Sequence, residues 1–199
     1  MDVKLTITGL GKIKAFANEC GPSGRRHLYQ VGANALAESV RRHLRSVAPS
    51  RHRTAERLGA KRTMHYENAV AAVAPGADAN HGEVVVPIAG ISRAYQDLDI
   101  TPVNASYLTL PLAAESYGHT AREMESRGWR LFRPKGKNIL MGTKGRGKDA
   151  VTKTLFALKK KVHQQKDPAL LPTQADATKT FVAAVAEECR RIIRKASAK

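Results

Sequence analysis

Residues 142–148 read Gly-Thr-Lys-Gly-Arg-Gly-Lys and have the GxxxxGK spacing of a phosphate-binding loop. In such loops the residue after the lysine is Ser or Thr, whose hydroxyl binds the magnesium ion that accompanies the phosphates. Asp149 stands there instead and would place a carboxylate beside the phosphates. Residues 150–163 also lack a clean helical pattern, whose N-terminus would bind an anion. We therefore expect no nucleotide cofactor and interpret residues 142–150 as a basic loop rich in Gly and Lys.

Other residues that could do chemistry are scattered along the chain. The seven histidines show neither an HExxH pattern nor a paired Cys and His spacing, so no metal site is predicted. We expect the alternating carboxylates Asp97 and Asp99, and Glu123 and Glu125, to be solvated or salt-bridged. No serine lies in a GxSxG turn. The sequence thus predicts no catalytic residue, no cofactor and no enzyme. A toxin or a hydrolase whose site residues meet only in the fold is the weaker alternative.

Charge is the strongest feature of the composition. The chain of 199 residues has 34 Lys and Arg against 17 Asp and Glu, a formal net charge of +17. Residues 24–63 carry 10 basic and 2 acidic side chains, and residues 120–166 carry 14 basic and 3 acidic side chains. A positive field of this size attracts acidic partners. We expect nucleic acid, an acidic ring of protein subunits or anionic lipid to compensate it.

Two sets of cations are our candidates for contacts with an acidic partner or with DNA. The first set lies on one face of an early helix and comprises Arg41, Arg42 and Arg45, and the second lies in the basic loop and comprises Lys144, Arg146 and Lys148. The alternative for each set is an ordinary solvated face.

The apolar runs do not indicate a membrane span, and the cysteines do not indicate a disulfide bond. No apolar run approaches the roughly 18 residues of a membrane span, so no membrane partner is expected. Cys20 and Cys189 lie far apart in the sequence, and we expect free thiols in a reducing compartment.

Apolar residues at spacings of three and four predict the helices that must position these cations. The clearest helix covers residues 25–47 and ends before Pro49, and Gly32 inside it indicates a close helix contact. A second helical stretch is expected over residues 50–74 with a break at Gly59. An amphipathic helix closes the chain over residues 173–195, with Thr173 as its N-cap.

Alternating and β-branched segments predict the strands. Strands are expected at residues 2–8, 83–91 and 154–163, the second of them an edge strand or a bulge because it contains Pro87. The remaining expectations are a short helix at 10–19 closed by a turn at 20–24, a loop at 75–80, strands at 100–103 and 107–112 joined by a turn at 104–106, and a hairpin of 129–133 with 138–141.

This order of elements predicts the fold class. Helices come first, strands follow and a helix closes the chain, with little alternation of strand and helix, which favours an α+β fold. We expect an antiparallel sheet packed against the early helix and the C-terminal helix, with extended basic loops, in one domain over residues 1–199.

Three segments resemble virion morphogenesis proteins of tailed bacteriophages, which include the tail-completion and neck families. Residues 31–44, in a long early helix followed by Pro49, look like the first half of these proteins. Residues 102–118 are similar to a segment in which "L-x-L/I-P" precedes "A-E-x-Y-G", and residues 131–140 look like the hairpin that follows it. The resemblance spans roughly residues 25–195.

The resemblance implies a non-enzymatic structural role in neck or tail completion at the head–tail junction. Such proteins typically form rings around a channel. We therefore expect a virion protein, made in the host cytoplasm, that forms a homo-oligomeric ring around the DNA channel. Its expected partners are other virion proteins, namely a connector, a tail tube or a tail terminator, with non-specific contact to DNA. The alternative is a stand-alone basic nucleic-acid-binding protein.

Overall fold

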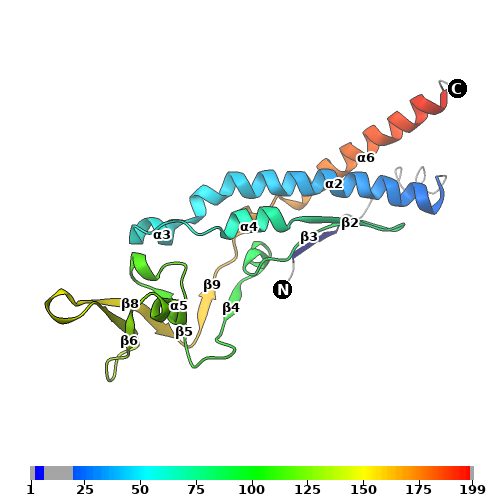
Figure 1. Cartoon of the computed structure of the whole chain (residues 1–199). Helices are drawn as coiled ribbons and strands as arrows, with labels where there is room; N and C mark the ends of the chain where they lie inside the picture. Colours follow the sequence, from blue (N-terminus) through cyan, green and yellow to red (C-terminus); the bar gives the residue numbers. More distant parts are fainter. Residues whose placement is uncertain (1–2, 7–19, 198–199) are drawn as a thin grey trace. The chain divides into compact units, whose positions relative to one another are not determined.

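The computed structural model describes residues 3–6 and 20–197 and confirms an α+β fold with antiparallel sheets, a long early helix and a C-terminal helix (Figure 1). The chain forms two compact units. Unit 1 comprises Met1–Pro49, His65–Gln96 and Lys166–Lys199, and unit 2 comprises Ser50–Met64 and Asp97–Gln165. The short helix predicted at residues 10–19 lies outside the described residues, and the single domain over residues 1–199 stays a prediction.

The long helix of unit 1 is α2 (Gly21–Val47), which confirms the helix predicted over residues 25–47. It begins earlier than predicted because Pro22 lies in its first turn, where a helix needs no N–H donor. The predicted turn over residues 20–24 is therefore wrong from Gly21 onward. The apolar stripe of α2 is buried, with at most 1% of each side chain exposed at Leu28, Leu36, Val40 and Leu44.

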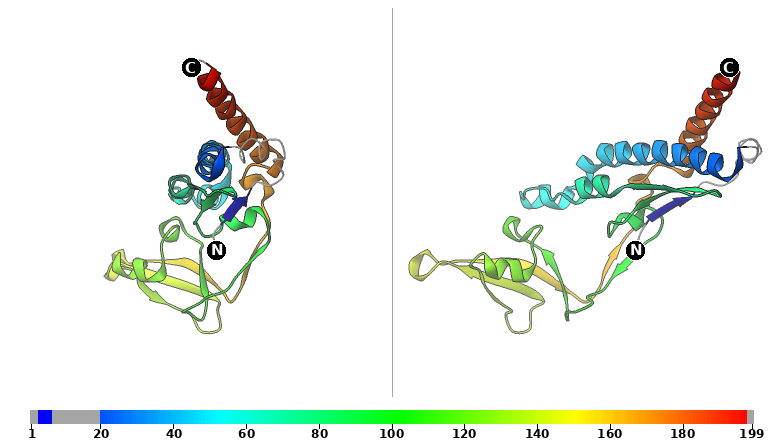
Figure 2. Two further views of the ribbon diagram at one scale, coloured as in Figure 1. Left: turned by 90° about the vertical axis from the view of Figure 1, so that its right-hand side faces the viewer. Right: turned by 45° about the vertical axis from the view of Figure 1, so that its right-hand side comes forward.

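The C-terminal helix, α6 (Gln174–Ser197), also belongs to unit 1 and packs against α2. Its predicted N-cap is confirmed, because the Thr173 hydroxyl accepts a hydrogen bond of 3.2 Å from the backbone N–H of Asp176. Phe181 and Val185 are completely buried on its apolar side. The last turns of α6 diverge from α2 and are exposed (Figure 2).

One aromatic ring fixes how closely the elements of unit 1 approach. A Cβ atom on Gly32 of α2 would lie 2.6 Å from the ring of Phe181, and a Cβ atom on Gly82 would lie 2.8 Å from the same ring. The close helix contact expected at Gly32 is thus confirmed. Two glycines leave the space that the buried Phe181 ring fills.

The sheet of unit 1 has the strand order β1-β3-β2 and is antiparallel. Its strands are β1 (Val3–Thr6), β2 (Ala74–Ala77) and β3 (Gly82–Val86). The loop predicted at residues 75–80 is wrong over residues 75–77, which lie in β2 at the edge of the sheet, where Pro75 is tolerated. The strand predicted at residues 83–91 is confirmed over residues 83–86 as β3, but its predicted edge position is wrong, because β3 is central and ends before Pro87.

The second predicted helical stretch is confirmed as two short helices, α3 (Arg53–Leu58) of unit 2 and α4 (His65–Ala72) of unit 1. The break falls at Gly59 as predicted. Its φ of 62° is a left-handed conformation that glycine adopts without strain and that ends α3.

The main sheet of unit 2 has the order β5-β8-β7-β6, with all neighbours antiparallel. Its strands are β5 (Leu108–Pro111), β6 (Arg130–Phe132), β7 (Ile139–Lys144) and β8 (Val151–Lys159). The predicted hairpin is confirmed as β6–β7. The strand predicted at residues 154–163 is confirmed over residues 154–159 as β8, but its continuation is wrong, because residues 162–164 form a separate strand, β9 (Val162–Gln164), in another sheet.

The two strands expected at residues 100–103 and 107–112 do not form a hairpin. The strand predicted at residues 100–103 is wrong beyond Ile100, which ends β4 (Leu98–Ile100), a strand that pairs with β9. The second predicted strand is β5, which pairs with β8. Both strands pair with strands that come later in the sequence and not with each other across the local turn. By pairing with β8, β5 completes a four-stranded sheet.

The core of unit 2 is small and depends on a β-bulge. Leu140 pairs with Phe156 and Met141 pairs with Thr154, so Leu155 is an extra residue in β8. The bulge lets the consecutive side chains Leu155 and Phe156 both be buried. They pack with Trp129 and with Met124 of α5 (Ala121–Ser126), a helix capped reciprocally by Thr120 and Glu123.

The contact at Gly32 generates a prediction. Gly32→Leu should lower the free energy of unfolding by about 2 kcal/mol, because the new side chain needs the space of the Phe181 ring. Adding Phe181→Ala should cost less in this background than in the wild-type chain, with a coupling energy of about 1 kcal/mol or more. Urea unfolding followed by circular dichroism measures both values.

The matched control is Asn34→Leu, which puts the same residue on the exposed face of α2. We expect it to change the free energy of unfolding by about 0.5 kcal/mol or less. Equal losses for the two leucine variants, or strict additivity with Phe181→Ala, would contradict this account of the α2–α6 contact.

Candidate functional site

The GxxxxGK segment forms the end of a hairpin between β7 and β8. Gly142 to Lys144 belong to β7, a turn follows, and a short 3-10 helix, η4 (Gly147–Asp149), leads into β8. The basic loop predicted over residues 142–150 is therefore wrong at its first three residues. A phosphate-binding loop precedes a helix, whereas this segment precedes a strand.

The glycines of this segment have structural roles of their own. Gly142 is buried, and a Cβ atom there would lie 2.5 Å from the Leu155 side chain and 3.0 Å from those of Leu131 and Trp129. Gly147, the second glycine of the spacing, has a φ of 59°, and Gly145 has a φ of 91°, and the hairpin turn requires both of these left-handed conformations. The GxxxxGK spacing therefore arises from core packing and turn geometry.

The hairpin end brings together the second set of predicted contact cations. Lys144, Arg146 and Lys148 are all exposed. The ammonium of Lys144 lies 5.9 Å from the centroid of the Trp129 ring, within the range of a cation–π contact. These three cations form the hairpin cluster. The cluster is exposed and positively charged, and it contacts the unit 2 core through Lys144 and Trp129.

The first set, Arg41, Arg42 and Arg45, lies on α2 in unit 1, and its members differ in role. Nη2 of Arg41 donates a 2.8 Å hydrogen bond to the carbonyl of Val73, just after α4, so Arg41 ties α2 to the end of that helix. Arg41 and Arg45 also lie 3.5 and 3.8 Å from the carboxylate of Glu38. Arg42 is exposed beside them. Arg42 and Arg45 are thus the exposed members of this set, whereas Arg41 is half-buried.

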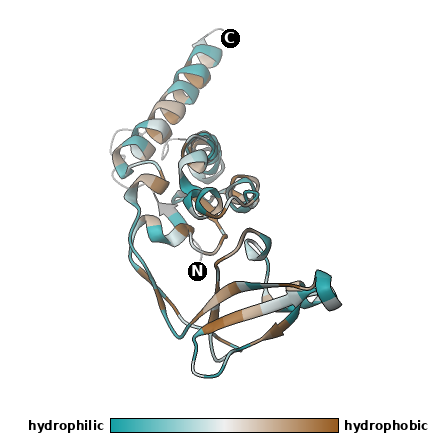
Figure 3. Ribbon diagram, turned by 90° about the vertical axis from the view of Figure 1, so that its left-hand side faces the viewer, coloured by the Kyte–Doolittle hydropathy of each residue, from teal (hydrophilic) through white to brown (hydrophobic). Residues whose placement is uncertain are grey.

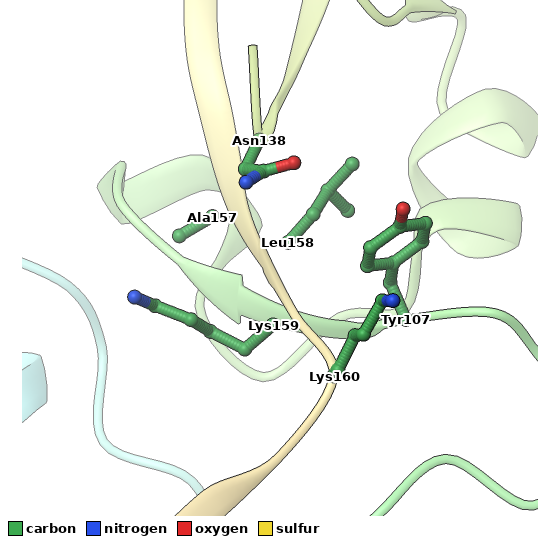
Figure 4. A pocket seen from close by; sticks show the side chains of 6 residues that line it. All are labelled: Tyr107, Asn138, Ala157, Leu158, Lys159 and Lys160. Carbon is green, nitrogen blue, oxygen red and sulfur yellow. The ribbon is translucent and has the colours of Figure 1, made fainter.

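A third cationic site lies at the edge of the unit 2 sheet. A depression of about 470 Å³ is lined by Tyr107, Asn138, Ala157, Leu158, Lys159 and Lys160 (Figure 4). The guanidinium carbon of Arg133 lies 4.8 Å from the centroid of the Tyr107 ring. We call these lining residues together with Arg133 the Tyr107 depression.

The sequence contains only part of the signal for the Tyr107 depression. Arg133 and Asn138 flank the turn of the predicted β6–β7 hairpin, so their proximity follows from that prediction. Tyr107 comes near Lys159 because Leu108 is opposite Lys159 in the β5–β8 pair. The predicted hairpin of residues 100–103 with 107–112 gave no reason to place them together.

Many of the described carboxylates form ion pairs. Asp99 lies 2.9 Å from Nδ1 of His163 and 2.8 Å from Nζ of Lys161, and both partners lower the pKa of its carboxyl. Glu123 serves as a cap for α5. The expectation that these carboxylates are salt-bridged or solvated is thus confirmed for Asp99. Among the described residues, no group of His, Cys, Asp and Glu is arranged to hold a metal ion.

Glu188 is the most perturbed carboxyl of unit 1. It is buried on α6, and hydrogen bonds from Arg191 and then from His27 lower its pKa to about 2, against the effect of burial. His27 of α2 lies 2.7 Å from this carboxylate. The group is therefore ionised at neutral pH and links α6 to α2, a structural role.

Comparison with protein-family models, with curated proteins and with solved structures finds no match for this chain. In the described part of the chain, none of the helices has the length and apolar character needed to cross a membrane. Both cysteines are free thiols.

The different roles of two neighbouring arginines can be tested. Arg41→Ala should lower the free energy of unfolding by about 1 kcal/mol, because it leaves the carbonyl of Val73 without its donor. Arg42→Ala removes the same charge from the same helix and should change this free energy by about 0.5 kcal/mol or less. Urea unfolding of both variants measures the difference, and equal effects would contradict the structural role of Arg41.

Proposed function

We propose that this protein is a non-enzymatic structural component of a tailed-bacteriophage virion that acts in neck or tail completion at the head–tail junction. In this proposal it assembles as a homo-oligomeric ring around the DNA channel. Its partners are other virion proteins, namely the connector, the tail tube or the tail terminator. Its location is the virion.

The observation that carries the proposal is positive charge that the chain cannot neutralise by itself. If every one of the 17 Asp and Glu paired with a different cation, half of the 34 Lys and Arg would remain. Arg42 on α2 and the three residues of the hairpin cluster are exposed. A DNA channel or an acidic ring of subunits supplies the opposite charge that such surfaces need.

The segments that resemble phage morphogenesis proteins form ordered elements. Residues 31–44 lie within α2, and residues 102–118 contain β5 and the 3-10 helix η3 (Ala114–Ser116). Residues 131–140 span the β6–β7 turn. This arrangement supports the proposal because the similar stretches fall on elements of the scaffold.

The exposed end of α6 supports a contact between subunits. A shallow depression of about 460 Å³ is lined by Glu187, Arg190, Ile193 and Arg194, and Ile193 is 51% exposed. Glu187 forms ion pairs of 2.8 Å with Arg190 and 2.9 Å with Arg194. Figure 3 shows hydrophobic residues along α6 up to this end. An apolar side chain among ordered charges suits a protein interface.

A stand-alone nucleic-acid-binding protein is the second candidate function. The observation that favours it is the hairpin cluster, in which the exposed Lys144 lies beside the ring of Trp129. A monomer that is absent from particles and keeps submicromolar affinity for DNA at about 150 mM salt would favour this function.

The proposal predicts that quantitative mass spectrometry finds this chain in purified particles in several copies per particle. When the gene is supplied in trans, Ile193→Glu should reduce incorporation severalfold, because it places a charge in the proposed subunit contact. Val103→Glu is the matched control. It makes the same change at a loop residue that is 92% exposed, and we expect normal incorporation.

Absence of the chain from purified particles would contradict the virion role. Equal incorporation of the Ile193→Glu and Val103→Glu variants would contradict the contact at α6 while leaving the virion role in place.

A further inference from the structure

The Tyr107 depression contains a preorganised cation. Nε of Arg133 donates a 2.9 Å hydrogen bond to the carbonyl of Lys137, and Nη2 donates one of 2.9 Å to Oδ1 of Asn138. The same guanidinium stacks on the ring of Tyr107. A guanidinium has more N–H groups than these two bonds use. Arg133 is thus held in one orientation and can still donate to a ligand at little entropic cost.

Two further cations flank the floor of the depression. Lys159 and Lys160 are exposed at the end of β8, and their side chains extend to different sides of it (Figure 4). None of the six lining residues is acidic. A hydrogen bond from Arg133, then the charge of Arg133 and to a smaller extent that of Lys160, lower the pKa of the Tyr107 phenol.

The depression also has an apolar and an aromatic part beside its cations and the Asn138 amide. Ala157 and Leu158 form part of the lining, and the half-buried Tyr107 ring stands beside them. A site that binds acidic side chains needs only cations and would not require this aromatic and apolar surface. A nucleotide presents both a flat base and an anionic phosphate, and aromatic rings and arginine planes are the usual surfaces on which unpaired bases stack.

We propose that the Tyr107 depression binds a segment of single-stranded nucleic acid. Lys159 and Lys160 neutralise its phosphates, and one unpaired base stacks on the Tyr107–Arg133 pair. A single strand is required because the bases of a duplex are stacked on each other and cannot reach a tyrosine face. The inference does not rest on the virion role, since it concerns the isolated chain.

The test uses the full-length chain and a fluorescein-labelled oligothymidylate of roughly 20 nucleotides at about 100 mM NaCl, with fluorescence anisotropy as the readout. Lys159→Gln combined with Lys160→Gln should weaken binding about tenfold. It should also reduce the slope of log affinity against log salt by about 1.4, because two phosphate contacts of a single strand are lost.

The charge-matched control is Arg122→Gln combined with Arg127→Gln, two exposed cations of the α5 region outside the depression. This control should weaken binding by about twofold or less, because it changes only the general field. Loss of affinity to the same extent in both double variants would overturn the proposal in favour of bulk charge.

Substitutions of Tyr107 test the proposed stacking of a base. Tyr107→Leu should weaken binding about tenfold with an unchanged salt slope, because stacking involves no counterion release. Tyr107→Phe keeps the ring and should bind like the wild-type chain. Thermal unfolding of each variant shows whether the fold is intact, and a loss of affinity confined to Tyr107→Leu in folded protein supports the stacking role.

Two competitors separate single strands from other polyanions. A duplex of the same length and poly-L-glutamate of the same charge should each compete at least tenfold less well than unlabelled oligothymidylate. Equal competition by poly-L-glutamate would show a site for acidic protein, and equal competition by the duplex would show a general phosphate site. Either result overturns the proposal. Particle composition plays no part in this assay, so its failure leaves the virion role untouched.

Discussion

An excess of positive charge that the chain cannot neutralise is the constraint on which the rest of the structure depends. The net charge of +17 equals the number of acidic side chains, so complete pairing would still leave 17 cations. The carboxylates of the chain form contacts within the fold. Glu188 joins α6 to α2, Asp99 binds Lys161 and His163, and Glu123 caps α5. The surplus is left on exposed surfaces such as the end of the β7–β8 hairpin.

The scaffold that carries this charge consists of close, specific packing in small cores. In unit 1 the Phe181 ring fills the space that Gly32 and Gly82 leave. In unit 2 a bulge in β8 buries Leu155 and Phe156 together, and Gly142 leaves room for Leu155. These contacts fix the strand ends at which Lys144, Arg133 and Lys159 project. These cations therefore lie at or next to the ends of strands that the core packing holds in place, and their contact with an acidic partner is a proposal.

The helices, and the contact at Gly32, could be predicted from the sequence because apolar spacing and glycine placement are local signals. Strand positions were also largely predictable, but strand partners were not, apart from the local β6–β7 hairpin. Pro87 indicated an edge strand, yet it follows a central strand, and Pro75 lies in the edge strand instead. The Tyr107 depression was missed for the same reason, since it depends on the distant β5–β8 pairing.

The central claim is that unneutralised cations repel one another within the folded chain and await an acidic partner. The most direct test is the midpoint of thermal unfolding, measured by circular dichroism on the isolated chain across a NaCl series. From about 0.01 M to 0.1 M salt the screening length falls from about 30 Å to about 10 Å, which weakens this repulsion. The account predicts that the midpoint rises by several degrees over this range. A midpoint that stays constant or falls would contradict it.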